Sequence, residues 1–191
     1  MIKIKKSNSA LRPSSKPDAL DEEDKLDVIK QEYQLAQDSL VDYAYYKTEM
    51  EKYRVELPVK PDFKDLSKIN KLYAIAQSYS SRVTAIEVEA IDNHSRWERL
   101  VNYMAGYIDD KHFKLLTRPD IAEMTNMKAE AAVKVALAKE QQTLRKFKDK
   151  ENEAASFMRM VITKKKDLTS VLQTLGKQVS ALSLEHSTIR Q

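Results

Sequence analysis

A seven-residue repeat in the last third of the chain limits its possible folds more than any other feature. Alternating steps of three and four residues join Val133, Leu137, Glu140, Leu144, Phe147, Glu151, Ala154, Met158, Val161, Lys165, Leu168, Leu172, Leu175, Val179, Leu182, His186 and Ile189. A repeat of this length predicts a long helix in a left-handed coiled coil or bundle. We expect a homo-oligomer, because the narrow leucine seam at 168–182 needs cover. Cover by the chain's own first two helices is the open alternative.

Composition favours the same fold class. The chain has only 2 glycines and 5 prolines in 191 residues, and 32% of its residues are charged. Such a chain has few turn residues for building sheets and ample material for long helices. We therefore predict an elongated all-α protein with three to four long helices in coiled-coil or helical-bundle packing.

The predicted organisation has three parts. Residues 1–18 form a basic arm without apolar periodicity, read as disordered. It is either a solvated tail without a role or an arm that binds an acidic partner or nucleic acid. Residues 19–116 form an antiparallel hairpin of two helices, over 19–56 and 63–105. Pro58 and Pro61 separate the two helices, because proline cannot donate to a helix ladder.

The third part, 117–191, is a long heptad helix or a helix pair. Gly106 and the segment "IDDKHFKLLT" at 108–117 are predicted to connect it to the hairpin, and part of this connection could remain helical. Thr117 is the expected N-cap, followed by Pro119 in the first turn. A bend or break is expected around "KFKDKENEA", where the apolar stripe thins.

Signatures of catalysis and of metal binding are absent from the sequence. The chain contains no cysteine, which excludes disulfides and thiolate ligands. It has no Gly-rich phosphate loop and no H-E-x-x-H, and its three histidines are far apart. We predict no enzyme activity, no cofactor, no metal and no small-molecule substrate. No apolar run reaches the length of a membrane span and no signal peptide is present, so a cytoplasmic protein is expected.

Basic residues in the C-terminal part are the best functional candidates. Residues 118–191 carry 14 Lys or Arg against 9 Asp or Glu. The predicted nucleic-acid-binding residues are Arg145, Lys146, Lys148, Lys150, Arg159, Lys164 and Lys166. A basic stripe can follow a phosphodiester backbone, and interleaved aromatic residues such as Phe147 can stack on bases. Lys165 is assigned to the seam instead, because it falls on the heptad repeat.

Two segments carry a resemblance to a known family. They are "LLTRPDIAEM" at 115–124, a helix start after a hydrophobic pair, and the closing "DLTSVLQTLGKQVSALSLEHSTIR" at 167–190. In these features the chain resembles the UvsY-like recombination mediators of T4-type phages. The resemblance implies an oligomeric accessory protein that binds single-stranded DNA, with a recombinase or a single-strand-binding protein as partner. For a phage-encoded protein, it also implies the host cytoplasm.

Two functions therefore follow from the sequence as expectations. The first is a non-catalytic oligomeric accessory protein that binds single-stranded nucleic acid. The second is a structural or assembly coiled-coil subunit, a phage or scaffold component, that binds only partner helices. Salt-dependent oligonucleotide binding distinguishes them, because each neutralised phosphate adds to the salt slope.

Overall fold

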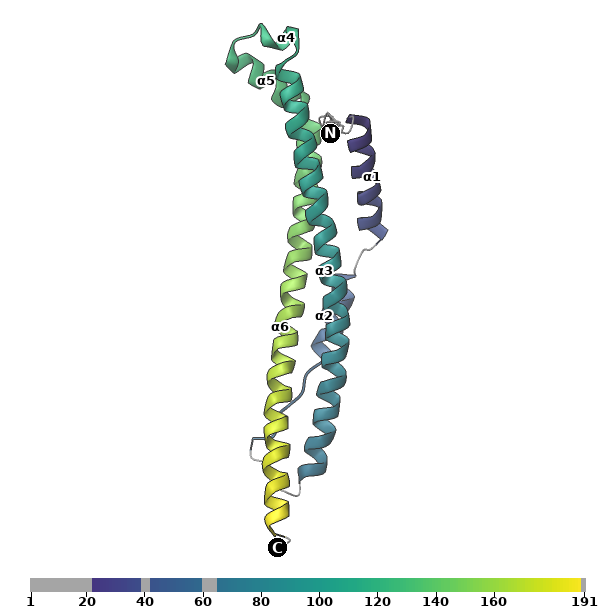
Figure 1. The fold of residues 1–191 in the computed structure, drawn as a ribbon, viewed down its shortest axis with the longest axis vertical. Coiled ribbons are helices and arrows are strands. Elements are labelled where there is room, and N and C mark those ends of the chain that lie inside the picture. The colour runs from purple at the N-terminus through teal and green to yellow at the C-terminus, as the bar shows by residue number, and fades with distance from the viewer. Residues whose placement is uncertain (1–21, 39–41, 60–64, 190–191) are drawn as a thin grey trace, which may run out of the picture.

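Two antiparallel helices of similar length form the body of the protein (Figure 1). The structure is a computed structural model that describes residues 22–38, 42–59 and 65–189. α3 (Leu66–Leu116) has 51 residues and α6 (Ala138–Ile189) has 52. At 1.5 Å per residue each helix is about 77 Å long. This confirms the predicted elongated all-α fold, and no described helix combines the length and apolarity that crossing a membrane requires.

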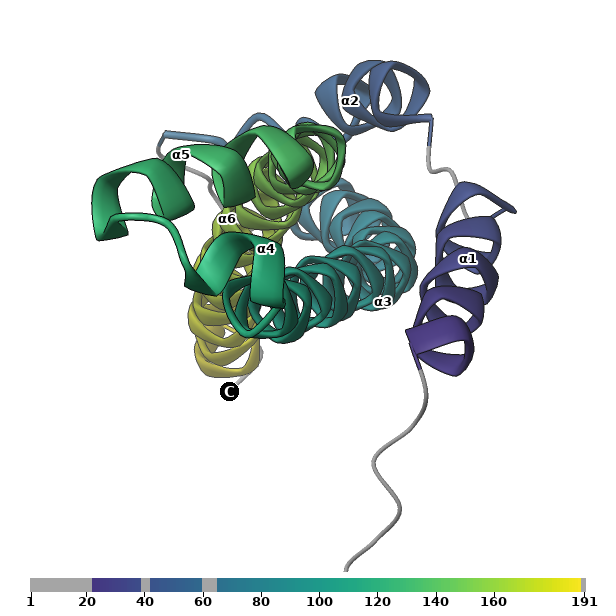
Figure 2. The ribbon, with the colours of Figure 1, turned by 90° about the horizontal axis from the view of Figure 1, so that it is seen from above.

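Two shorter helices run antiparallel to α3 along one flank of the α3–α6 pair (Figure 2). They are α1 (Glu22–Asp38) and α2 (Tyr43–Lys52), so the single helix predicted over 19–56 is in fact two. Asp42 begins α2, because its side chain accepts a 2.9 Å hydrogen bond from the backbone N–H of Tyr45. The arm predicted over 1–18 lies outside the described residues.

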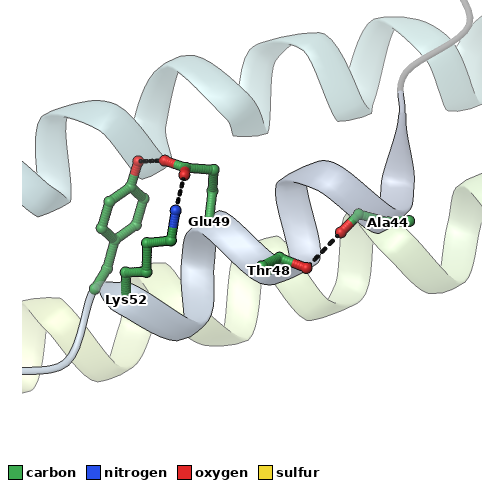
Figure 3. A network of polar contacts seen from close by, with 5 residues as sticks. Ala44, Thr48, Glu49 and Lys52 are labelled. Atoms are coloured by element: carbon green, nitrogen blue, oxygen red, sulfur yellow. Dashed lines mark hydrogen bonds and ion pairs between the residues drawn. The ribbon is translucent and has the colours of Figure 1, made fainter.

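Polar contacts within α2 hold its last turn together (Figure 3). Glu49 accepts from Lys52 at 2.5 Å and from the Tyr53 hydroxyl at 3.3 Å. The Lys52 hydrogen bond lowers the pKa of the Glu49 carboxyl. Thr48 donates back to the carbonyl of Ala44 at 3.0 Å. The helix therefore ends just before the extended segment that leads to Pro58.

The connection between the two long helices differs from the prediction. α3 continues without interruption through Gly106 to Leu116, so the segment predicted as a connection is helical except for its last residue, Thr117. Two short helices, α4 (Pro119–Ala122) and α5 (Asn126–Ala136), then cap the upper end of the molecule (Figure 1). The chain turns again at the buried Leu137 and enters α6. α6 shows no break at 146–154, contrary to expectation.

Thr117 is not an N-cap, contrary to the prediction. It closes the C-terminus of α3, and its hydroxyl donates to the carbonyl of Lys114 at 2.9 Å. Arg118 occupies the N-cap position of α4, with Pro119 as the first helical residue. The sequence signal of a proline inside a first turn was real, but it belongs to a helix of four residues.

The seam of α6 packs against α3 within a single chain. The deepest heptad positions are buried: Phe147, Ala154, Val161, Leu168, Leu175 and Leu182. In the lower third, Leu175 and Leu182 pack against Ile69 and Ala76 of α3. Since α3 covers the leucine seam, the seam no longer requires a second copy of the chain. The side chains of His186 and Ile189, at the end of the repeat, lie outside those described.

Candidate nucleic-acid interface

The seven predicted nucleic-acid-binding residues all lie on α6, but they do not share one face. An α-helix turns by about 100° per residue, so residues two apart point in widely different directions. Lys146 and Lys150 line a groove between α6 and α1. Lys164 lines two small clefts beside α2. Lys166 lines another small cleft with Lys165 and Glu87 of α3. Arg145, Lys148 and Arg159 line none of these hollows.

The remaining four residues, together with a fifth cation further along the helix, form one row on the outer side of α6. Steps of 3, 11, 7 and 11 residues each return nearly to the same helix face. We call this row the outer stripe; its members are Arg145, Lys148, Arg159, Lys166 and Lys177. All five are exposed, and the stripe covers about 48 Å at 1.5 Å per residue. None of them forms an ion pair with a described residue.

The residues between these cations are neutral. They are Asn152, Ser156, Thr163, Ser170 and Gln173, all exposed. Moreover, Arg159, Lys166 and Lys177 have no Asp or Glu three or four residues away. Ion pairs between helix neighbours occur at these spacings, so these three charges have no partner on their own helix. Arg145 and Lys148, in contrast, have Asp149 and Glu151 at these spacings. The excess of positive charge is therefore greatest in the C-terminal part of the stripe.

The lysines that face α1 and α2 also have acidic neighbours. Lys146, Lys150 and Lys164 are each followed, three residues later, by a carboxylate. One of these pairs is closed, with Lys150 Nζ 2.7 Å from Glu153 Oε2. The outer stripe is thus narrower on the Lys146 side than the set of residues predicted from the sequence, and longer at its C-terminal end.

Sequence reasoning missed Lys177, although a signal for it was present. Lys177 lies 11 residues after Lys166 and 18 after Arg159, which correspond to about three and five helical turns. It lies outside the dense basic cluster at 144–166, so a search for locally high charge does not find it. Phase along the helix, rather than density along the sequence, identifies the row.

Phe147 does not provide a stacking surface for bases, contrary to the expectation. Its side chain is only 6% exposed. It stacks on Tyr33 of α1 with ring centroids 5.4 Å apart and planes at 29°. Trp97 of α3 completes the cluster at 6.1 Å from Phe147. The aromatic residue inside the basic cluster is therefore part of the core.

Lys165 lies in the seam, in the position that the heptad phase predicted. Its ammonium forms an ion pair with Glu87 of α3. The carboxylate side chain is 17% exposed and the lysine side chain 36%. Of the three consecutive lysines, one therefore faces α3, one the α2 side and one the outer stripe.

The titratable groups with shifted pKa values belong to structural contacts. Burial, with a contribution from Glu153, raises the pKa of Tyr43 to about 12. The Tyr43 hydroxyl donates to Oδ1 of the buried Asn93 at 2.7 Å. A hydrogen bond with Glu140 raises the pKa of Lys111. Within the described part of the chain, no group of three His, Asp or Glu could hold a metal.

Comparison with protein-family models, with curated proteins and with solved structures gives no match for this chain.

Proposed function

We propose that the protein is a non-catalytic accessory protein that binds single-stranded nucleic acid along the outer stripe. The observation that carries this proposal is the row of five exposed cations that form no ion pair with any residue the structure describes, separated by neutral polar residues. Lysine and arginine that neutralise phosphates release counterions, which supplies sequence-independent affinity. The neutral residues between them can donate hydrogen bonds to phosphate and sugar oxygens.

A single strand suits this surface better than a duplex. The stripe follows one side of a single helix for about 48 Å, longer than one turn of B-DNA at about 34–36 Å. A duplex is stiff, with a persistence length of about 50 nm, and its phosphates wind away from a straight row within one turn. A flexible single strand can follow all five cations. Binding would rest on phosphate contacts, since the stripe carries no aromatic residue.

The resemblance to recombination mediators supports the same proposal from a separate direction. It adds the specific expectation of a role beside a recombinase or single-strand-binding protein, and of an oligomer. The covered leucine seam gives the oligomer no further support, so that expectation rests on the resemblance alone.

The test is the salt dependence of oligonucleotide binding, measured by fluorescence anisotropy with a labelled oligothymidine of about 20 nucleotides. Five phosphate contacts predict a log–log slope of about −3.5, at about −0.7 per contact for a single strand. Arg159→Ala with Lys166→Ala should make the slope shallower by about 1.4. The matched double variant, Lys146→Ala with Lys164→Ala, also removes two positive charges from α6 but should leave the slope unchanged.

A slope near zero for the native protein would reject the proposal and favour the structural or assembly subunit. Equal loss of slope in both double variants would reject the outer stripe as the interface. A duplex of the same length should bind more weakly at every salt concentration; tighter duplex binding would contradict the single-strand assignment.

A further inference from the structure

An exposed tyrosine lies beside the C-terminal end of the outer stripe. Tyr73 of α3 has 36% of its surface exposed. Its ring carbon Cε2 lies 3.9 Å from the position that a methyl group on Gly176 of α6 would occupy. Gly176 directly precedes Lys177, the last cation of the stripe. The stripe itself carries no aromatic residue, but α3 therefore places one next to it.

The helical repeat of α3 puts Tyr73 on the side of the seam that the stripe borders. Tyr73 lies two heptads before Glu87, so the two residues occupy equivalent positions along the seam. Glu87 lines a cleft of about 450 Å³ between the long helices together with Lys166 of the stripe. The lining of this cleft continues toward Gly176 with Thr169, Ser170 and Gln173. The cleft and the tyrosine ring therefore follow one another along the same side of the α3–α6 pair.

The lower parts of the two long helices carry positive charges and no negative ones (Figure 1). Residues 66–86 of α3 and 168–184 of α6 contain no Asp or Glu. Their charged residues are Lys68, Lys71, Arg82 and Lys177. Lys177 forms no ion pair with any residue the structure describes. An anionic strand beside Tyr73 would therefore meet no repulsion from either of these segments.

Two amide side chains flank the tyrosine ring on α3. Asn70 lies three residues before Tyr73 and Gln77 four residues after it, the spacings at which helix neighbours share a face. Both side chains are exposed. Amide groups can donate to and accept from the polar edges of an unpaired base, and an aromatic ring can stack on its face. The ring and the two amides therefore suit a base rather than a phosphate alone.

We propose that Tyr73 stacks on a base of the bound strand while Lys177 contacts a phosphate next to that base. The inference rests on the proposed single-strand function and adds to it a contact that requires an unpaired base. Stacking of this kind tolerates any sequence, because every base has a π face. In a duplex the faces of a base are covered by its stacked neighbours. The contact therefore selects strands with free bases over duplexes and over polyanions without bases.

Tyr103 of α3 provides a matched control. It is 43% exposed, similar to Tyr73. It lies four heptads and two further residues after Tyr73, and two residues correspond to a rotation of about 200° around the helix. Tyr103 therefore points away from the side that the stripe borders, and its ring should not contact the strand.

The experiment compares two labelled single strands of equal length by fluorescence anisotropy. One is oligothymidine, and the other is an abasic strand that carries the same phosphates without bases. We expect Tyr73→Ala to weaken oligothymidine binding at least about fivefold, the lower end of the effect of stacking on one base. Its affinity for the abasic strand and both salt slopes should remain native, which also shows that the variant is folded. Lys177→Ala should weaken the binding of both strands and make both slopes shallower by about 0.7.

Two further variants make the test specific to the aromatic ring. Tyr73→Phe keeps the ring and should bind both strands as the native protein does. Tyr103→Ala should also bind both strands as the native protein does.

The outcomes separate this inference from the proposed function. A slope near zero for the native protein on oligothymidine would overturn both. A native slope near the expected value, together with unchanged oligothymidine binding by Tyr73→Ala, would overturn the stacking contact alone. An equal loss for the two strands in Tyr73→Ala would also overturn it, because the ring would then act on the fold or on the phosphate contacts. Equal losses in Tyr73→Ala and Tyr103→Ala would overturn it as well.

Discussion

Lys165 of α6 and Glu87 of α3 form an ion pair across the seam between the two long helices. The pair interrupts a row that is otherwise apolar, because Val161 and Leu168, the neighbouring heptad positions, are both buried. A lysine in such a position usually costs stability and limits register. Here its cost is offset by a carboxylate on the facing helix. The pair therefore specifies how α3 and α6 align along their length.

This pairing changes what a leucine at position 165 should do. Sequence alone predicts that Lys165→Leu raises stability, because it extends the apolar stripe. In the structure, the same change leaves Glu87 at 17% exposure without its cation. Removing one partner of such a pair is unfavourable, so we expect the free energy of unfolding to fall by about 1 kcal/mol. Urea unfolding followed by circular dichroism measures this.

The double variant Lys165→Leu with Glu87→Leu is the control. Replacing both charges by apolar residues removes the unpaired carboxylate, so stability should recover to the native level or above it. A single Lys165→Leu variant more stable than the native protein would mean that the ion pair contributes nothing. The heptad argument from sequence would then be sufficient.

The neighbours of Lys165 should differ in nucleic-acid binding. Lys166 belongs to the outer stripe, while Lys164 faces the α2 side with Asp167 three residues later. Lys166→Ala should make the salt slope for a single strand shallower by about 0.7, the value for one phosphate contact. Lys164→Ala should leave it unchanged. Anisotropy titrations at several salt concentrations separate the two outcomes, and equal effects would place the interface elsewhere.

Helical periodicity alone predicted the long helix α6 and the face that it buries. It could not predict which helix packs against that face. The repeat from Val133 onward identified the buried positions of α6 other than Phe157, because a seven-residue period fixes which side chains face a neighbour. The same repeat carries no information about which helix provides that neighbour, so the sequence left cover by the chain's own helices and cover by a second copy both open. Lys177 lies outside the dense basic cluster at 144–166, so only its position in the helical repeat relates it to the other cations of the stripe.

The breaks in the helices were the least predictable part. Gly106 looked like a helix end, yet it lies inside α3 with no helix-ending contact. A glycine in a helix costs stability without necessarily ending the helix, and burial of Met104, Tyr107 and Ile108 around it outweighs that cost. The groove beside α1 has no sequence signature, because it depends on where the separate helix α1 lies relative to α6.

Gly106→Ala should stabilise the protein. A methyl group at this position would meet no other atom within 4 Å, so it causes no clash. Alanine has the higher helix propensity, and we expect a gain of about 0.5–1 kcal/mol. Thermal unfolding monitored by circular dichroism would show a raised melting temperature. Gly176→Ala is the comparison variant. Position 176 is also helical, but there the added methyl group would lie 3.9 Å from the Tyr73 side chain. A loss of stability in Gly106→Ala would indicate that α3 is interrupted there.

Thr117→Ala should have little effect on stability. An N-cap threonine typically contributes about 0.5–2 kcal/mol, but the Thr117 hydroxyl only donates to the Lys114 carbonyl one turn earlier, at an exposed site. We expect a change below about 0.5 kcal/mol, typical of surface substitutions. Urea unfolding of this variant beside the native protein decides the point. A loss above 1 kcal/mol would restore Thr117 as the cap of a helix.

The pair of Lys111 and Glu140 should make stability depend on pH in a defined way. The lysine hydrogen bond holds the pKa of the Glu140 carboxyl below its ordinary value. Because the folded-state pKa is depressed, the stabilisation is present above the unfolded pKa of about 4.5 and is lost as pH falls through the folded-state value. The pKa of Lys111 is raised, so its contribution disappears only as pH rises above about 10.5.

Glu140→Gln should therefore destabilise the protein at pH 7, and the loss should be smaller at pH 3, because the stabilisation fades as pH falls below about 4.5 and through the depressed folded-state pKa of Glu140. Glu140 also lies in the first turn of α6, where a negative charge interacts favourably with the helix dipole. Because the pair is partly exposed, we expect a loss of at most about 1 kcal/mol at neutral pH. Urea unfolding of both proteins at the two pH values measures the difference.

Glu130→Gln, at an exposed position of α5, is the control variant and should change stability equally little at both pH values. A loss in Glu140→Gln that is as large at pH 3 as at pH 7 would show that the carboxylate's charge is not what stabilises this end of the molecule.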